Sequence, residues 1–181
     1  MIVHETVESE VEPAPMRAEP EPDPGVVALR RGAYEQAAGI FLREHADQLG
    51  REKAEGSTAV VDRRPLRLHA LALLGAGACV ESAEAFARAY AEDPTLRFEP
   101  LDGQELLGSA SEVRSVMLKA MRFAKRTGTP EAWSMVGYLK QAQGKSQQAE
   151  DFFARAAAAQ VASPGPAGSR GALEPGTRSA I

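Results

Sequence analysis

The fold is decided by residues 130–156, whose sequence is PEAWSMVGYLKQAQGKSQQAEDFFARA. Pro130 suits the first turn of a helix, because the backbone donor that proline lacks has no partner in that turn. Gly144 interrupts the stretch at a point where glycine permits a tight turn between two helices. After it, Ala149 and Phe153 lie four residues apart and therefore share one face of a second helix. The stretch predicts two antiparallel helices that approach at a small residue and enclose an aromatic ring.

The same combination of glycine, small residue and phenylalanine occurs twice more in the chain. The three sets are Gly32, Ala37 and Phe41; Gly77, Ser82 and Phe86; and Gly144, Ala149 and Phe153. Three of the six phenylalanines thus have a glycine nine residues upstream. Self-similarity in one register is typical of arrays of equivalent helix pairs.

Composition and local signals support an all-α chain. Alanine is abundant, and no hairpin turn lies between strands of alternating polarity, so the sequence offers little from which to build a sheet. Ser109 and Glu112 have the spacing of a capping box, and the helix that they begin is expected to run to Gly128. The pair Asp93 and Pro94 is expected to end an earlier helix, because a proline pushes the residue before it out of the helical region.

These motifs resemble the tetratricopeptide repeat family. In the last copy Trp133, Val136 and Gly137 match the first helix of the family, and Ala149, Phe153 and Ala156 match the second. A second copy extends from Leu66 to Pro94, with His69 where the family usually has leucine, and a first copy keeps mainly Gly32 to Phe41. The resemblance implies a short helical-repeat solenoid of three to four antiparallel helix pairs. It also implies an insertion around Gly50 to Val61 and a degenerate pair at Arg97 to Gly128.

The two ends of the chain differ in composition from its centre. Residues 1–24 contain seven acidic residues, one arginine and five prolines, a side-chain net charge of −6, and we expect this segment to be disordered. Residues 25–160 are expected to form the repeat domain. Residues 161–181, which are rich in Ala, Gly, Pro and Ser, are expected to be a disordered tail. Residues 25–181 carry 20 basic and 18 acidic side chains, and this near-neutral balance does not favour nucleic acid as a partner.

Several classes of site are not favoured by the sequence. Cys79 is the single cysteine, so no disulfide framework or cysteine zinc site is expected, and its expected role is that of a small buried apolar residue. The histidines His4, His45 and His69 lack the spacing of metal ligands. No acid and base pair stands out, so we expect neither catalysis nor a cofactor. The longest apolar stretch, Leu68 to Val80, is too short to span a bilayer and no secretory signal is recognisable, so a cytoplasmic protein is expected.

One enzymatic alternative remains open at the level of sequence. Gly75 and Gly77 follow an apolar run, as the glycines of a dinucleotide-binding turn follow a strand. Val80 stands where the third glycine of that motif is required. The alternative is therefore less favoured than a turn between two helices.

The resemblance implies a non-catalytic adaptor that holds a peptide or helix of another protein in a concave groove. The side chains expected to face this groove are Arg64, Arg67, Leu71, Ser134, Tyr138 and Gln141. An acidic ligand or a C-terminal carboxylate would suit the arginines. A second basic group, Arg114, Lys119, Arg122, Lys125 and Arg126, lies along another predicted helix.

Self-assembly is the main alternative to the adaptor. No polar capping helix follows Gln160, although repeat arrays usually need one. Trp133 and Phe153 are expected to pack within the last helix pair, whereas Phe152 is directed about 100° away on the same helix. Phe152 is thus available to a neighbouring helix pair, an uncovered end of the array or a partner, and the uncapped C-terminal end could join copies of the chain into a homo-oligomer.

Overall fold

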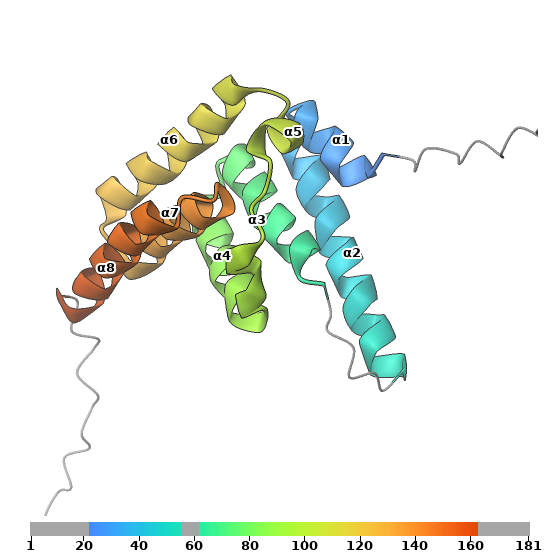
Figure 1. Cartoon of the computed structure of the whole chain (residues 1–181). Coiled ribbons are helices and arrows are strands. Elements are labelled where there is room, and N and C mark those ends of the chain that lie inside the picture. Colours follow the sequence, from blue (N-terminus) through green and yellow to red (C-terminus); the bar gives the residue numbers. More distant parts are fainter. Residues whose placement is uncertain (1–21, 56–61, 163–181) are drawn as a thin grey trace, which may run out of the picture.

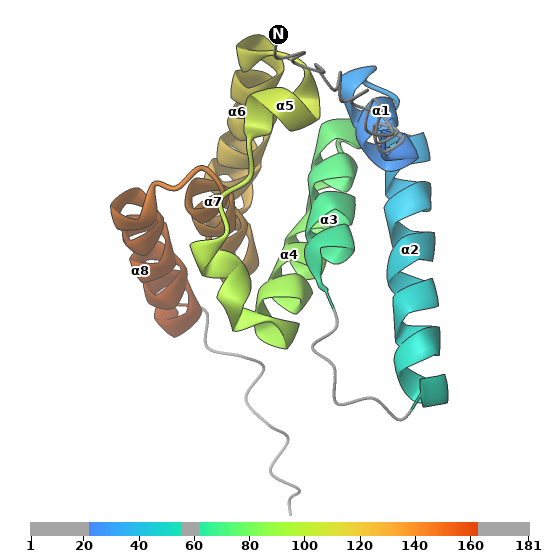
Figure 2. The same cartoon turned by 45° about the vertical axis from the view of Figure 1, so that its right-hand side comes forward.

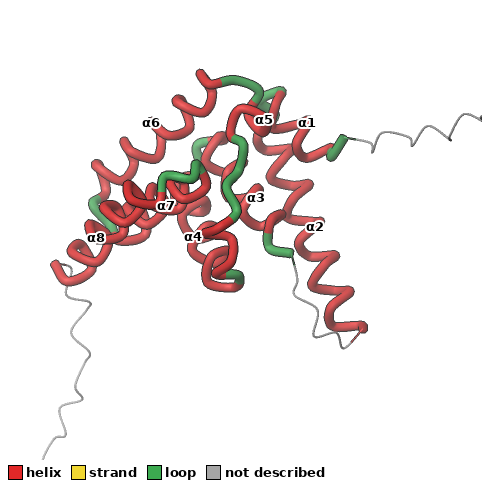
Figure 3. The backbone as a smooth tube through the Cα atoms, viewed as in Figure 1, coloured by secondary structure: helices red, strands yellow, loops and turns green. Residues whose placement is uncertain are grey.

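The computed structural model describes residues 22–55 and 62–162 (Figure 1). Helices joined by short loops make up these ranges, and no strand occurs in them (Figure 3), which confirms the all-α prediction. The expected disorder of residues 1–24 and 161–181 falls almost wholly outside the described residues, as does the part of the expected insertion from Gly56 to Val61. None of the helices within the described ranges is long and apolar enough to cross a membrane.

Three pairs of helices form the frame of the molecule. Helix α1 (Pro24–Arg30) packs on α2 (Tyr34–Glu55), α3 (Arg64–Ala76) packs on α4 (Cys79–Glu92), and α7 (Pro130–Ala142) packs on α8 (Ser146–Ala162). The pairs also contact one another, because α2 packs on α3 and α4 packs on α7 (Figure 2). Helices α2, α3, α4, α7 and α8 therefore follow one another across the molecule.

The turn inside each pair depends on the glycine that the sequence repeats. Gly32, Gly77 and Gly144 have φ angles of 73°, 92° and 70°, in the left-handed region that residues with a Cβ atom rarely adopt. Gly77 directly follows α3 in this conformation and ends that helix. The predicted turns between helices are confirmed at all three positions.

Two of the repeated phenylalanines, Phe41 and Phe153, pack on glycines that lie sixteen positions earlier. A Cβ atom added to Gly25 would lie 2.5 Å from the ring of Phe41, and one added to Gly137 would lie 2.5 Å from the ring of Phe153. In the central pair Ala70 takes this place before Phe86, and the hydroxyl of Ser82 donates a hydrogen bond to the Ala70 carbonyl oxygen at 2.8 Å. Small residues thus let the two helices of each pair approach closely.

Residues 94–129 do not form a further pair between α4 and α7. The 3-10 helix η1 (Pro94–Phe98) and the short α5 (Gly103–Leu107) occupy the first half, and only α6 (Ala110–Thr127) is a full helix. The expected degenerate pair at Arg97 to Gly128 is therefore replaced by an excursion of the chain, after which α7 packs directly on α4. The boundaries of α6 follow the sequence, since the Ser109 hydroxyl accepts a hydrogen bond from the Glu112 amide at 3.1 Å.

Helix α6 is fixed to the rest of the fold on its inner face. Val116, Ala120, Phe123 and Ala124 are buried there. Lys119 Nζ donates a hydrogen bond to the carbonyl oxygen of Gly75 at 2.5 Å, at the end of α3. The opposite face of α6 is left to solvent and carries exposed cations.

The expected insertion at Gly50 to Val61 begins as helix. Helix α2 continues without interruption to Glu55, so Gly50 to Glu55 extend the second helix of the first pair. The periodic core positions of this helix end earlier, and propensity rather than a repeat motif explains its length: the stretch from Arg51 to Glu55 consists of good helix formers.

Candidate functional site

The groove expected between α3 and α7 is occupied by the chain itself. The segment from Pro94 to Leu101 runs across this face (Figure 2), and η1 contacts both α4 and α7. Arg67 Nη1 donates hydrogen bonds to the carbonyl oxygens of Leu96 at 2.9 Å and Glu99 at 2.7 Å. At its other end the Leu101 amide donates to the Ala142 carbonyl oxygen at 2.7 Å.

Two of the six predicted groove residues are part of the interior, and a third is half-buried. Arg67 is 1% exposed and Leu71 is 6% exposed, so neither is free to contact a partner. Tyr138 lies in a stack of rings, 4.4 Å from the centroid of Tyr90 and 5.2 Å from that of Phe153. Burial raises the pKa of the Tyr138 hydroxyl. The burial of Arg67 and Leu71 contradicts the prediction that these two side chains line a partner groove, and sequence spacing alone did not show that they would be covered. For the half-buried Tyr138 it stays a prediction.

The other three predicted groove residues are not brought together. Arg64 is exposed near the start of α3 and lines small surface pockets beside Asp62 and Glu105. Ser134 and Gln141 are half-buried on α7. Neither lines the surface pockets beside Arg64, so these pockets do not unite the six residues.

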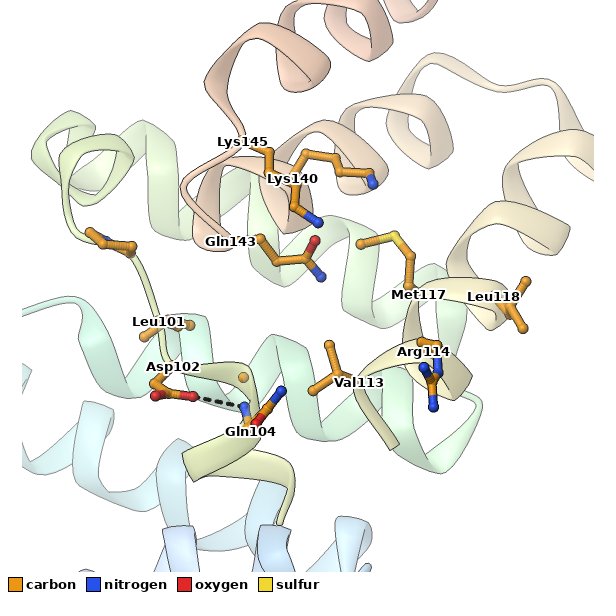
Figure 4. A pocket seen from close by; sticks show the side chains of 12 residues that line it. Leu101, Asp102, Gln104, Val113, Arg114, Met117, Leu118, Lys140, Gln143 and Lys145 are labelled. Carbon is orange, nitrogen blue, oxygen red and sulfur yellow. Dashed lines mark hydrogen bonds between the residues drawn. The ribbon is translucent and has the colours of Figure 1, made fainter. Parts of the chain in front are cut away.

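A larger cleft lies on the other side of the crossing segment. It has a volume of about 900 Å³ and opens between the loop before α5, the first half of α6 and the end of α7 (Figure 4). It is lined by Pro100, Leu101, Asp102, Gly103, Gln104, Val113, Arg114, Met117, Leu118, Lys140, Gln143 and Lys145. We refer to these residues as the α5–α7 cleft.

Local structure explains how the walls of the cleft are held. The Asp102 carboxylate accepts hydrogen bonds from the amides of Gln104 and Glu105, both at 2.9 Å, and so caps α5. Gly103 lies close to α6, because an added Cβ atom would be 3.2 Å from Val113 Cγ2. The bond from Leu101 to Ala142 ties the same loop to α7. The cap at Asp102, the close approach of Gly103 to α6 and the bond to Ala142 thus hold the backbone of this wall in place.

The cleft carries an excess of positive charge. Arg114, Lys140 and Lys145 contribute three cations, whereas Asp102 contributes one carboxylate that already caps a helix. Burial lowers the pKa of Lys140, and the neighbouring Lys145 cation lowers it further. An anionic group placed between these lysines would relieve their repulsion.

The inner end of the cleft is apolar. Leu101, Val113 and Met117 line both the cleft and a small cavity of about 40 Å³ that extends toward Leu71 and Phe86 in the core. Figure 4 shows Met117 and Val113 directed into the space between α6 and the loop before α5. Arg114 and the half-exposed Leu118 form the outer edge on α6. A ligand would therefore meet apolar side chains below and cations at the rim.

Trp133 and Phe153 pack within the last helix pair, as predicted, but Phe152 packs there as well. Trp133 stacks on Phe152, with ring centroids 6.1 Å apart, and the Arg155 guanidinium lies 5.5 Å and 5.4 Å from their centroids. Phe153 contacts Gly137 and Tyr138 instead. Phe152 is thus not directed away from its own pair, because the Trp133 ring covers one side of it.

The dinucleotide alternative lacks its strand. Residues 64–76 form helix α3, and Gly75 lies inside this helix, where an added Cβ atom would collide with the Tyr34 ring. Gly77 ends the helix. Both glycines therefore have a structural explanation, close packing for one and a left-handed turn for the other.

Cys79 is a free thiol. Cys79 is half-buried against the core, and burial raises the pKa of its thiol, which disfavours the thiolate. In the part of the chain that the structure describes, no three side chains of His, Cys, Asp or Glu gather in the manner of a metal site.

Most of the cleft residues escaped the sequence analysis. Arg114 belongs to the basic group recognised on the predicted helix, but Lys140, Lys145 and Asp102 were not singled out. Their signal was present: both lysines flank the turn at Gly144, and Asp102 precedes Gly103 as a helix cap. The missing information was that an irregular segment would bring Asp102 beside that turn.

No family model, curated protein or solved structure matches this chain.

Proposed function

We propose that this protein is a non-catalytic interaction module that binds an acidic peptide segment of another protein in the α5–α7 cleft. The observation that carries the proposal is the combination of three cations, Arg114, Lys140 and Lys145, with an apolar floor in a cleft of about 900 Å³. Such a cleft suits an extended or helical segment that has acidic residues and a few apolar anchors.

The frame around the cleft supports the same class of protein. Three helix pairs share a turn glycine, and in two of them a glycine lies against a phenylalanine ring, an arrangement that suits a short tetratricopeptide-like solenoid. Arrays of this kind expose broad surfaces between successive pairs and serve as scaffolds for other proteins. In our proposal residues 94–129 are an elaboration that fills the usual groove and creates a different cleft beside it.

The charges define the ligand more closely. Lys140 is half-buried and Arg114 is exposed, so a bound carboxylate could exchange hydration for a charge-assisted hydrogen bond at the rim. Asp102 would repel a carboxylate less than its charge suggests, because it accepts two backbone hydrogen bonds. Apolar side chains spaced along the ligand would reach Leu101, Val113 and Met117.

The proposal is tested with a displayed library of random peptides and two charge-reversal variants of the full chain. Arg114→Glu with Lys145→Glu reverses two cations of the cleft, whereas Arg43→Glu with Arg122→Glu reverses two exposed cations outside it. Both variants change the net charge by the same amount. We expect selected peptides to be acidic, to bind the second variant as tightly as the original chain, and to lose binding to the first.

Two results would contradict the proposal. If the selected peptides bind the two variants equally, the cleft is not their site. If selection yields no acidic peptide while both variants retain the thermal midpoint of the original chain, the cleft does not bind this class of ligand.

Self-assembly through the last helix pair has weaker support. Trp133 and Arg155 cover much of Phe152, the aromatic residue on which that alternative depended. Sedimentation of the full chain across a concentration series tests it directly.

A further inference from the structure

We propose that residues 1–21 of the same chain occupy the α5–α7 cleft and compete there with the partner. This inference rests on the proposed function, because it names a ligand and a form of regulation for the same site. In this inference the acidic residues 1–21 and the peptide of another protein compete for the same cleft.

Charge complementarity is the first argument. Residues 1–21 contain six glutamates and one arginine, a side-chain net charge of −5. The cleft presents Arg114, Lys140 and Lys145 against one carboxylate that is already engaged in capping a helix. The most acidic stretch of the sequence and this basic cleft therefore have opposite charges, which favours their encounter.

The apolar residues of the segment fit the floor of the cleft. Val3, Val7 and Val11 recur every fourth residue, with glutamates between them. Residues at this spacing share one face when a segment is helical. The segment therefore has the chemistry of the proposed ligand: apolar anchors for Leu101, Val113 and Met117, and carboxylates for the cations at the rim.

The point at which the segment joins the folded chain lies close to the cleft. Pro22 and Glu105 line the same surface pocket. Glu105 belongs to α5, whose first residue, Gly103, is part of the cleft wall. Arg30 Nε donates a hydrogen bond to the Glu105 carbonyl oxygen at 2.6 Å, so α1 and α5 are held together. Twenty-one extended residues can span up to about 70 Å, several times the diameter of about 10–12 Å of a helix with its side chains.

Tethering makes even a weak contact effective. A ligand joined to its site by a short connection has an effective concentration on the order of millimolar. A free peptide of similar affinity must therefore reach a comparable concentration before it displaces the segment from the cleft. The affinity of the intact chain for a partner is therefore expected to rise when the segment loses its charge.

The inference is tested by nuclear magnetic resonance with a spin label on the segment. A full chain with Cys79→Ala and Ser9→Cys carries one nitroxide at position 9, and its methionine methyl groups are labelled with carbon-13. Met117 reports from the cleft, and the chain with the reduced label serves as its reference. We expect the nitroxide to weaken the Met117 signal strongly compared with the reduced label.

Matched variants show whether the effect comes from the cleft. The Met117 effect should vanish in Arg114→Glu with Lys145→Glu and persist in Arg43→Glu with Arg122→Glu. It should also vanish when Glu5, Glu8, Glu10 and Glu12 are changed to glutamine, a substitution that leaves the folded residues untouched. An unaffected Met117 signal, or one weakened equally in all variants, would overturn the inference.

A mixture of two samples identifies another occupant. If spin-labelled chains weaken Met117 in separate carbon-13-labelled chains, the segment of a second copy fills the cleft, and the intramolecular inference fails. Failure of the inference is also distinct from failure of the proposed function. Library peptides that bind through the cleft while the nitroxide leaves Met117 unaffected would retain the function and remove the internal competitor. The opposite result is a nitroxide effect that depends on the cleft, together with no library peptide bound by the variant whose glutamates are changed to glutamine. It would retain the contact between the segment and the cleft and remove the proposed function.

Discussion

The guanidinium of Arg67 donates a hydrogen bond from Nη1 to the carbonyl oxygen of Leu96 at 2.9 Å, in an environment that leaves the arginine 1% exposed. The same nitrogen donates to the Glu99 carbonyl oxygen at 2.7 Å. A cation on α3 thus fastens the backbone of the segment that follows α4. The segment held by these hydrogen bonds covers the expected groove, and its path leads to the cleft.

Replacement of Arg67 is expected to destabilise the protein substantially. Arg67→Met retains much of the apolar stem of the arginine but removes the guanidinium. Two backbone carbonyl groups then lack their donor, and we expect this loss to lower the free energy of unfolding by about 2–4 kcal/mol. The matched control is Arg64→Met, since Arg64 is exposed on the same helix and should change stability by less than about 0.5 kcal/mol. Urea denaturation measures both. Equal midpoints for the two variants would contradict the anchoring role.

The repeated phenylalanines should differ in their contribution to stability. Phe86 is 1% exposed, so Phe86→Ala is expected to lower the free energy of unfolding by about 3–5 kcal/mol. Phe153 is half-buried, and Phe153→Ala should have a smaller effect. Thermal denaturation followed by circular dichroism gives the order of the two variants. The opposite order, or no loss for Phe86, would argue against the packing described for the central pair.

Local signals predicted the elements of the fold well. The turn glycines, the cap at Ser109 and the break at Asp93 act through neighbouring backbone groups, so a short window of sequence contains all the information they need. Phe41 and Phe153 likewise meet glycines within their own helix pairs, sixteen positions earlier in each case.

The site could not be predicted in the same way. Whether Arg67 faces a groove or the interior depends on where residues 94–101 lie, and that segment has no periodic pattern of its own. Its position is fixed by long-range contacts, such as the bond from Leu101 to Ala142. The cleft depends on the same contacts, so its residues share no motif in the sequence.

The contact between Gly137 and Phe153 can be tested with a double-mutant cycle. Gly137→Ala places a Cβ atom 2.5 Å from the present position of the ring, and the resulting overpacking should cost about 1–3 kcal/mol. In the Phe153→Ala background the added methyl group has room, so its cost should largely disappear. Gly39→Ala is a suitable control, because an added Cβ atom there meets nothing within 4 Å among the described residues. Additive effects of Gly137→Ala and Phe153→Ala would show that the two residues do not touch.

His45 is expected to make the fold sensitive to mild acid. Its side chain is 2% exposed on α2, and neither ring nitrogen hydrogen-bonds to a described residue. Burial lowers the pKa of the imidazole, and the Arg63 cation lowers it further, although the carboxylate of Glu92 opposes them. The native state therefore holds the ring neutral at a pH where the unfolded chain already binds a proton.

The sign of the effect follows from this difference in proton binding. Below about pH 6.5 the unfolded state gains a proton that the native state does not, so stability should fall as the pH drops toward the lowered pKa of His45. Above about pH 6.5 both states are neutral at this position and the contribution is constant. Urea denaturation from about pH 7.5 to about pH 5 should show the slope in the original chain and a reduced slope in His45→Leu. Burial raises the pKa of Glu92, but Arg88 and Arg63 outweigh it, so the pKa is lowered. The stability linked to Glu92 is therefore lost only under more acidic conditions, below the ordinary pKa of a glutamate. An unchanged slope in His45→Leu would assign the acid sensitivity to another group.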